Sequence, residues 1–240
     1  MSDTKSVLNA RRIYYLLFSQ LFVFTDKQNR YDKVLDLLNI IKQSPLNDEC
    51  AKAIDNLLLK FNTQNLENIV QEYDDIFHAP PHAIHNSFSF YEEGYETGSA
   101  CARVRKILAK TKIRRNEVDF KENEDNVGFC FALMQEFLNS QISDDEESGE
   151  FASQLFKTII NPNIDDFIDA VYEHENSDAY ALACIILQNF IEFERIFYET
   201  PKPIVDRKIK VQDGVSRSEV LRREQNRRAK RLERELSSDV

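Results

Sequence analysis

Apolar residues recur every three or four positions along most of the chain. In the first such segment, residues 6–24, they are Tyr14, Leu17, Phe18 and Leu21. This spacing places the side chains on one face of an α-helix, so it predicts amphipathic helices that pack on one another. The predicted helices span residues 6–24, 30–42, 48–61, 66–77, 99–113, about 122–138, 151–160, 162–175, 178–198 and 216–236.

Residues that break helices are rare in this sequence. The chain holds only 5 Gly and 6 Pro among 240 residues, fewer than the turns of a β-sandwich or the glycine loops of a Rossmann-type fold require. We therefore predict an all-α protein, a single globular helical domain of about ten helices with a charged C-terminal helix. The helical domain is expected to span residues 1–200, followed by a linker and a basic helical extension at residues 201–240.

Charge is distributed unevenly along the chain. Residues 217–240 carry eight Lys and Arg against five Asp and Glu, a net charge of +3, whereas the whole chain carries −10. The other 216 residues therefore carry −13. An acidic body of this kind attracts cationic peptides and repels nucleic acid and anionic membrane surfaces, so no nucleic-acid partner is expected.

The sequence contains neither an export signal nor a membrane-spanning segment of the usual kind. The N-terminal segment reads as an amphipathic helix without a following cleavage site, and no segment reaches about 18–20 uninterrupted apolar residues. The cysteines Cys50, Cys101, Cys130 and Cys184 are widely spaced and form no CxxC pair, which disfavours a zinc site. We therefore predict a cytoplasmic protein with reduced thiols and no stable membrane insertion.

The helical pattern breaks between residues 78 and 99, where two prolines and two glycines predict a long loop. Long loops in compact domains are more often functional than incidental. Phe77, Phe88, Phe90 and Tyr91 lie in or beside this segment. These aromatic residues either anchor the loop on the core or line one wall of a peptide groove.

Motifs of enzymatic catalysis are missing from the sequence. It contains no Walker A motif, GxGxxG, GxSxG or HExxH, so we predict a non-enzyme without catalytic residues, metal or cofactor. His78, His82 and His85 have the spacing of one helical face, but Pro80 and Pro81 between them remove the helical basis for a shared metal site. A metal-dependent hydrolase that uses these histidines is the weakest alternative.

Three carboxylates precede the apolar helix predicted after residue 122. Glu122, Glu124 and Asp125 are expected in its first turn, where acidic side chains complement the helix dipole and cap free backbone amides. Gly128 follows within the same turn. Because glycine is costly inside a helix, it suggests the close approach of another backbone.

These two regions together resemble the TorD/DmsD/NarJ family of molybdoenzyme-specific chaperones. The family motif E-P-E-D-H-[IL]-G appears here as Glu-Asn-Glu-Asp-Asn-Val-Gly at residues 122–128, followed by Leu133-Met134. The second motif is an aromatic pair followed by a proline-containing loop, and here its residues are Tyr73, Phe77, Pro80, Pro81, Ser87 and Tyr91. Asn123 replaces the motif's proline and Asn126 its histidine. Asn126 can donate a hydrogen bond but cannot titrate near neutral pH.

The resemblance implies binding of the twin-arginine signal peptide of a molybdopterin-containing oxidoreductase, which is held until its cofactor is loaded. Its implied partners are this signal peptide and the apo form of the enzyme, with formate dehydrogenase favoured over dimethyl sulfoxide reductase and trimethylamine oxide reductase. Carboxylates suit paired arginines, and an aromatic trough suits the apolar part of the signal. The peptide-binding residues expected are Glu122, Glu124, Asp125, Asn126, Tyr73, Phe77, Pro81, Ser87, Phe90, Tyr91 and Gly128.

The basic extension supports a second hypothesis of a different class. An adaptor would act through this predicted helix on RNA or on a larger protein complex. However, the segment lacks aromatic residues and a clean apolar face, so a solvated helix is an equally good interpretation. The linker also permits exchange of the last helix between chains, so a monomer and an exchanged dimer both remain open.

Overall fold

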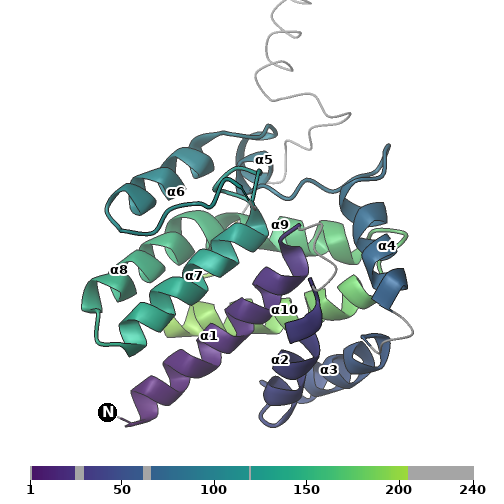
Figure 1. Cartoon of the computed structure of the whole chain (residues 1–240), viewed down its shortest axis with the longest axis horizontal. Helices are drawn as coiled ribbons and strands as arrows, with labels where there is room; N and C mark the ends of the chain where they lie inside the picture. The colour runs from purple at the N-terminus through teal and green to yellow at the C-terminus, as the bar shows by residue number, and fades with distance from the viewer. Residues whose placement is uncertain (1, 25–29, 62–65, 119, 205–240) are drawn as a thin grey trace, which may run out of the picture.

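The computed structural model describes residues 2–24, 30–61, 66–118 and 120–204, and all regular secondary structure in these ranges is helical (Figure 1). The elements are α1 (Ser2–Phe22), α2 (Asp32–Lys42), α3 (Asp48–Lys60), α4 (Leu66–Phe77), α5 (Phe88–Glu93), α6 (Ser99–Ala109), α7 (Val127–Ile142), α8 (Glu146–Leu155), the π-helical turn η1 (Phe156–Ile160), α9 (Asn161–Tyr172) and α10 (Ala179–Phe197). The predicted all-α class, with one helical domain, is confirmed.

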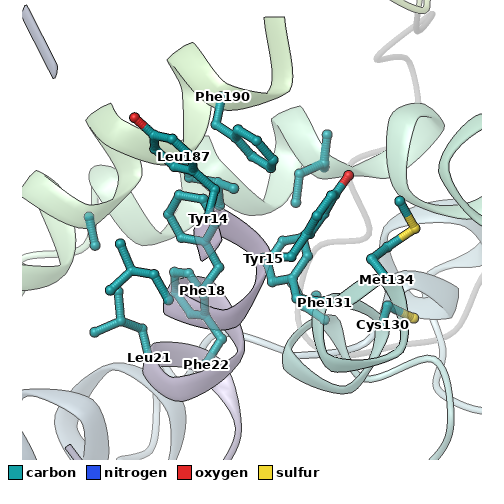
Figure 2. Close-up of a cluster of buried hydrophobic side chains, with 14 of the residues drawn as sticks. Tyr14, Tyr15, Phe18, Leu21, Phe22, Cys130, Phe131, Met134, Leu187 and Phe190 are labelled. Atoms are coloured by element: carbon teal, nitrogen blue, oxygen red, sulfur yellow. The ribbon is translucent and has the colours of Figure 1, made fainter. Parts of the chain in front are cut away.

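The core is centred on α1, which runs beside α7 (Figure 1). Figure 2 shows aromatic side chains of α1 between those of α7 and α10. The ring centroids of Phe18 and Phe131 are 5.8 Å apart, and those of Tyr15 and Phe190 are 4.9 Å apart in an edge-to-face arrangement. All four rings are fully buried, and each contributes on the order of 1.5–3 kcal/mol through the removal of apolar surface from water.

A charged cluster also lies in this core. The guanidinium of Arg11 donates to Glu194 through Nε (2.5 Å) and Nη2 (2.9 Å), and the Tyr15 hydroxyl donates to Glu194 Oε2 (2.7 Å). Arg11 also lies over the ring of Phe197, 3.7 Å from its centroid. Burying such a pair is favourable only when both charges stay partnered. The helical pattern gave no sign of this pair, because its members are 183 positions apart.

Two sequence predictions about the middle of the chain need correction. Residues 78–99 are not a continuous loop, because α5 forms at Phe88–Glu93 and ends at Gly94 in the left-handed conformation (φ 80°). The three carboxylates at residues 122–125 do not lie in a helical turn. The helix begins later, at Val127, because the side chain of Asn126 caps it by accepting a hydrogen bond from the amide of Phe129 (2.9 Å).

The remaining differences lie at helix ends and in the C-terminal extension. Helix α8 begins at Glu146, five residues before the predicted start, with Glu146 and Glu147 in its first turn. The predicted helix at residues 216–236 lies outside the described residues, as does nearly all of the predicted extension. Within the described ranges, no helix combines the length and apolar character needed to cross a bilayer.

Gly128, in the first turn of α7, lies against the backbone at the end of α1. A Cβ atom at this position would lie 2.5 Å from the carbonyl carbon of Phe22 and 2.5 Å from the amide nitrogen of Val23. The backbone that approaches Gly128 is therefore the end of α1, and helix packing explains this glycine without a bound peptide. Its prediction as a peptide-binding residue receives no support from this position.

Replacing Gly128 with Ala is expected to lower the free energy of unfolding by about 1–3 kcal/mol, because rigid backbone must shift to admit the methyl group. Urea denaturation followed by circular dichroism measures the change. Gly149→Ala is the matched control, since its Cβ would meet only the flexible end of Gln141, and alanine favours a helix by about 1 kcal/mol over glycine. Equal losses in both variants would contradict the close-packing explanation.

Candidate functional site

A cavity of about 710 Å³ opens between the end of α4, the segment before α5 and the segment before α7. Its size lies within the range typical of ligand-binding sites. The residues that line it are Tyr73, Phe77, His78, Pro80, Pro81, Ala83, Ile84, His85, Asn86, Ser87, Glu96, Lys121, Glu122, Asn123, Asp125 and Asn126. Both sequence regions that carry the family resemblance therefore meet in one cavity.

Backbone pairing holds these two regions together. Ser87 and Asn126 form an isolated antiparallel β-bridge, in which the amide of Phe88 donates to the Asp125 carbonyl (3.0 Å) and the amide of Val127 to the Asn86 carbonyl (3.3 Å). The loop also contains a cis peptide bond between Pro80 and Pro81. Such pairing gives the polar backbone groups of an irregular segment their partners, which a buried loop requires.

Asp125 holds the segment before α5 in place through hydrogen bonds. Its side chain is fully buried, and Oδ2 accepts hydrogen bonds from the Ser87 hydroxyl (2.7 Å) and the Ser89 amide (3.0 Å). The second oxygen, Oδ1, is buried and meets no donor in good geometry among the described residues, although the Cys101 thiol lies beside this carboxylate. Asp125 therefore positions the loop, and it also leaves one unsatisfied acceptor at a residue that lines the cavity.

Glu122 lines the cavity, and its negative charge is not neutralised by an arginine or lysine among the described residues. It is half-buried and accepts a hydrogen bond from the amide group of Asn126. Burial raises the pKa of Glu122, and the nearby Glu96 adds to the rise, while His78 and the Asn126 amide act in the opposite direction. The ionised carboxylate is therefore poorly solvated, and a cationic ligand would relieve this cost.

Glu124 lies outside the cavity lining, and its charge is already neutralised by the protein. Its carboxylate pairs with Arg105 (2.8 Å) and Arg115 (3.6 Å). Although burial alone would raise it, the pKa of Glu124 is lowered by its own backbone amide and by these two arginines. The three adjacent carboxylates thus have three different environments, and only Glu122 combines cavity exposure with the lack of a strong cationic partner among the described residues.

Asn126 has two structural roles in the place where the family motif has histidine. It caps α7 through its side-chain oxygen, and it donates from Nδ2 to Glu122. Asparagine is among the best N-capping residues, so the replacement suits the start of the helix. The same side chain therefore sets the position of the cavity-facing carboxylate.

The predicted aromatic wall is present only in part. Tyr73 and Phe77 line the cavity, and their ring centroids lie 4.6 Å apart. Phe90 lies behind the lining and stacks on His85 (3.8 Å between centroids). Tyr91 points toward the core, where its ring packs edge-to-face against Phe167 (6.0 Å). Phe90 and Tyr91 therefore act as loop anchors in this structure, as the first of the two sequence interpretations had it.

Seven of the predicted site residues line the cavity, namely Tyr73, Phe77, Pro81, Ser87, Glu122, Asp125 and Asn126. Glu124, Phe90, Tyr91 and Gly128 do not belong to the lining. Sequence reasoning missed Asn86 and Glu96. Asn86 donates to the carbonyl of Phe22 (2.8 Å), a contact across 64 positions that no local pattern reveals.

Two of the three histidines considered as metal ligands contact carboxylates. His78 contacts Asp74 (2.9 Å) and His85 contacts Glu96 (3.0 Å), and both histidines line the cavity. Across the described ranges, no three His, Cys, Asp or Glu side chains come together in an arrangement that would hold a metal ion.

Fold and cavity together define a helical protein with an acidic pocket, which is formed by the two segments that carry the family resemblance. A model of the nitrate reductase delta subunit family matches residues 43–173, which include every residue of the cavity lining. This match covers more than half of the chain, and the chain belongs to that family, whose members are chaperones of molybdoenzyme maturation rather than catalysts. The resemblance inferred from the two motifs is confirmed. No curated protein sequence matches the chain.

Proposed function

We propose that this chaperone binds the twin-arginine signal peptide of its client molybdenum oxidoreductase in the cavity described above. It holds the apo enzyme in the cytoplasm until the molybdopterin cofactor is loaded, and formate dehydrogenase is the favoured client. The observation that carries this proposal is Glu122, a poorly solvated carboxylate beside the rings of Tyr73 and Phe77.

The chemistry of an arginine pair fits this arrangement. A guanidinium offers planar donors that match a carboxylate in two parallel hydrogen bonds, and it stacks on aromatic rings. The cavity contains carboxylate acceptors at Glu122 and Glu96 and an aromatic edge at Phe77, which is 8% exposed, whereas Arg30 already lies over the ring of Tyr73 (4.1 Å to its centroid). The apolar part of the signal would follow the partly buried side chain of Ile84 and the exposed prolines of the same loop.

A labelled 20-residue synthetic peptide with an Arg-Arg pair and an apolar run tests this function by fluorescence anisotropy. A peptide with Lys-Lys at the same positions is expected to bind at least tenfold more weakly, because lysine cannot form the bidentate contact. Affinity for the Arg-Arg peptide is also expected to fall steeply as salt is raised from about 0.05 to 0.5 M. Equal affinity for both peptides would contradict the assignment, and salt-independent binding would place recognition on the apolar wall.

A further inference from the structure

The cavity that we assign to the signal peptide holds more carboxylates than cationic groups within the described part of the chain. Its lining holds the carboxylates Glu96, Glu122 and Asp125 against the single lysine Lys121. Glu96 contacts only a histidine, His85, among the ion pairs that the structure records. Asp125 is 0% exposed and its carboxylate also lies beside the buried thiol of Cys101, so the accessible acceptors of the cavity are Glu122 and Glu96. Burial leaves the ionised carboxylate of Glu122 poorly solvated, and Glu96 adds a second negative charge to the same lining, so the cavity favours a donor-rich, cationic occupant.

Three arginines on the segments around the cavity pair with glutamates that do not line it. Arg103 pairs with Glu92, and Arg105 pairs with Glu124. Arg115 contacts Glu117 (3.2 Å) and Glu124 (3.6 Å). Arg30 lies over the ring of Tyr73, 4.1 Å from its centroid, but it forms no ion pair with Glu122. Within the described ranges no arginine is paired with the Glu122 carboxylate, so a guanidinium bound to it would come from a client or from the rest of the chain.

The rest of the chain contains the chemistry that the proposed function assigns to the client. Residues 221–231 read Leu-Arg-Arg-Glu-Gln-Asn-Arg-Arg-Ala-Lys-Arg. This segment holds two Arg-Arg pairs, at residues 222–223 and 227–228, and residues 217–240 carry +3 against −13 for the remainder. Charge complementarity between the segment and the acidic domain is therefore strong.

The described chain ends against α9, a helix that also packs on the cavity lining. Lys202 pairs with Asp165 in the first half of α9 (3.4 Å), and the Pro201 carbonyl accepts from Asn161 (3.1 Å). Two residues after Asp165, the ring of Phe167 stacks on the cavity-lining ring of Phe77 (6.3 Å). Seventeen residues, 205–221, separate this point from the first arginine pair. Fully extended they reach about 55–60 Å, which exceeds the diameter of about 40–45 Å expected for a compact domain of about 200 residues.

We propose that the arginine pairs at residues 222–223 and 227–228 occupy the signal-peptide cavity of the same chain when no client is bound. This inference rests on the proposed function of the cavity. A tethered segment is present at an effective concentration in the millimolar range, so even a weak intrinsic affinity keeps the cavity occupied for much of the time. A client signal must then displace the segment, which lowers its apparent affinity and favours signals that offer contacts beyond the arginine pair.

Two full-length variants test this proposal by the anisotropy assay. In the first, Arg222, Arg223, Arg227 and Arg228 are replaced by Gln. In the matched control, Arg207, Lys208, Lys210 and Arg217 are replaced by Gln, which removes four positive charges and leaves both arginine pairs intact. The first variant is expected to bind the synthetic Arg-Arg peptide about three- to tenfold more tightly than the wild type, and the control within twofold of it. Equal tightening in both variants, or tightening in neither, would overturn the proposal.

A second measurement does not depend on the client peptide. The backbone amides of Ser89 and Phe129 donate to Asp125 and Asn126 at the cavity. Their NMR chemical shifts are expected to change between the wild type and the arginine-pair variant, but not in the control. If neither the wild type nor the variants bind the synthetic peptide while these chemical shifts still change, the proposed function fails and the internal docking stands. Unchanged shifts would overturn the docking itself.

A double-mutant comparison locates the contact. In a Glu122→Gln background, the four arginine substitutions are expected to produce no further tightening, because the carboxylate that holds the guanidinium is already gone. Persistent tightening would place the segment elsewhere on the acidic surface and overturn the proposal.

Analytical ultracentrifugation distinguishes the two possible sources of the segment, the same chain or a second copy. A concentration-dependent dimer that the arginine substitutions abolish would show docking between chains and overturn the intramolecular form.

Discussion

Replacing Glu122 with Gln is expected to weaken binding of the Arg-Arg peptide by about ten- to one-hundredfold. A hydrogen bond to a charged group contributes about 1.5–3 kcal/mol, which corresponds to this range of affinity. Glutamine keeps the acceptor that Asn126 uses and the shape of the side chain, so the effect reports the charge alone. Anisotropy titration of the variant against the wild type measures the loss.

The same substitution is expected to leave the fold as stable as before, or to stabilise it. Burial raises the pKa of Glu122 in the folded protein, which means that its ionised form is disfavoured there. The resulting cost to stability is absent below the unfolded-state pKa and appears as the pH rises through and above that value. Thermal denaturation should therefore show a stability advantage of Glu122→Gln at neutral pH that shrinks as the pH is lowered toward 4.

Glu117→Gln provides the control for general electrostatics, because it removes the same charge from an exposed side chain outside the cavity lining. Its affinity for the peptide is expected to stay within twofold of the wild type. A Glu122→Gln protein with unchanged affinity would refute the role of this carboxylate. Charge reversal at Asp125 would be a poor test of binding, since it breaks the contacts that Asp125 makes with Ser87 and Ser89.

Replacing Glu194 with Ala is expected to lower the free energy of unfolding by about 3–5 kcal/mol. The substitution leaves the guanidinium of Arg11, which is 1% exposed, as an uncompensated charge in the core, and it removes the acceptor of the Tyr15 hydroxyl. Urea denaturation followed by circular dichroism measures the loss. This is the largest effect on stability that we expect from any single substitution considered.

Glu136→Ala is the control for Glu194→Ala, since Glu136 is an exposed glutamate on α7, and its effect should stay within about 0.5 kcal/mol. The double replacement Arg11→Met with Glu194→Leu is expected to recover more than half of the loss, because the penalty arises mainly from the unpaired charge. A cost below about 1 kcal/mol for Glu194→Ala would mean that water or a rearranged partner compensates Arg11.

The carboxylates at residues 122–125 show how much of the candidate site could be predicted from the sequence. Their position between the aromatic loop and an apolar helix was sufficient to indicate the family, and the family match confirms it. The sequence did not separate their roles. The charge of Glu124 is neutralised by Arg105 and Arg115, and Asp125 accepts hydrogen bonds from Ser87 and Ser89. These partners lie on other segments of the chain, which a local pattern does not place.

Periodicity by itself determined that this protein is all-α, because a helix can bury its apolar residues only if they recur every three or four positions. The sequence also located the loop and the acidic segment, since both interrupt that period. The tertiary structure decided which side chains meet. It brought Arg11 to Glu194 across 183 positions, turned Tyr91 toward the core, and placed Glu122 in the cavity lining while Arg105 and Arg115 neutralise Glu124 outside it. Contacts of this kind depend on the packing of whole helices against one another, and packing is a property of the assembled chain rather than of any local stretch of it.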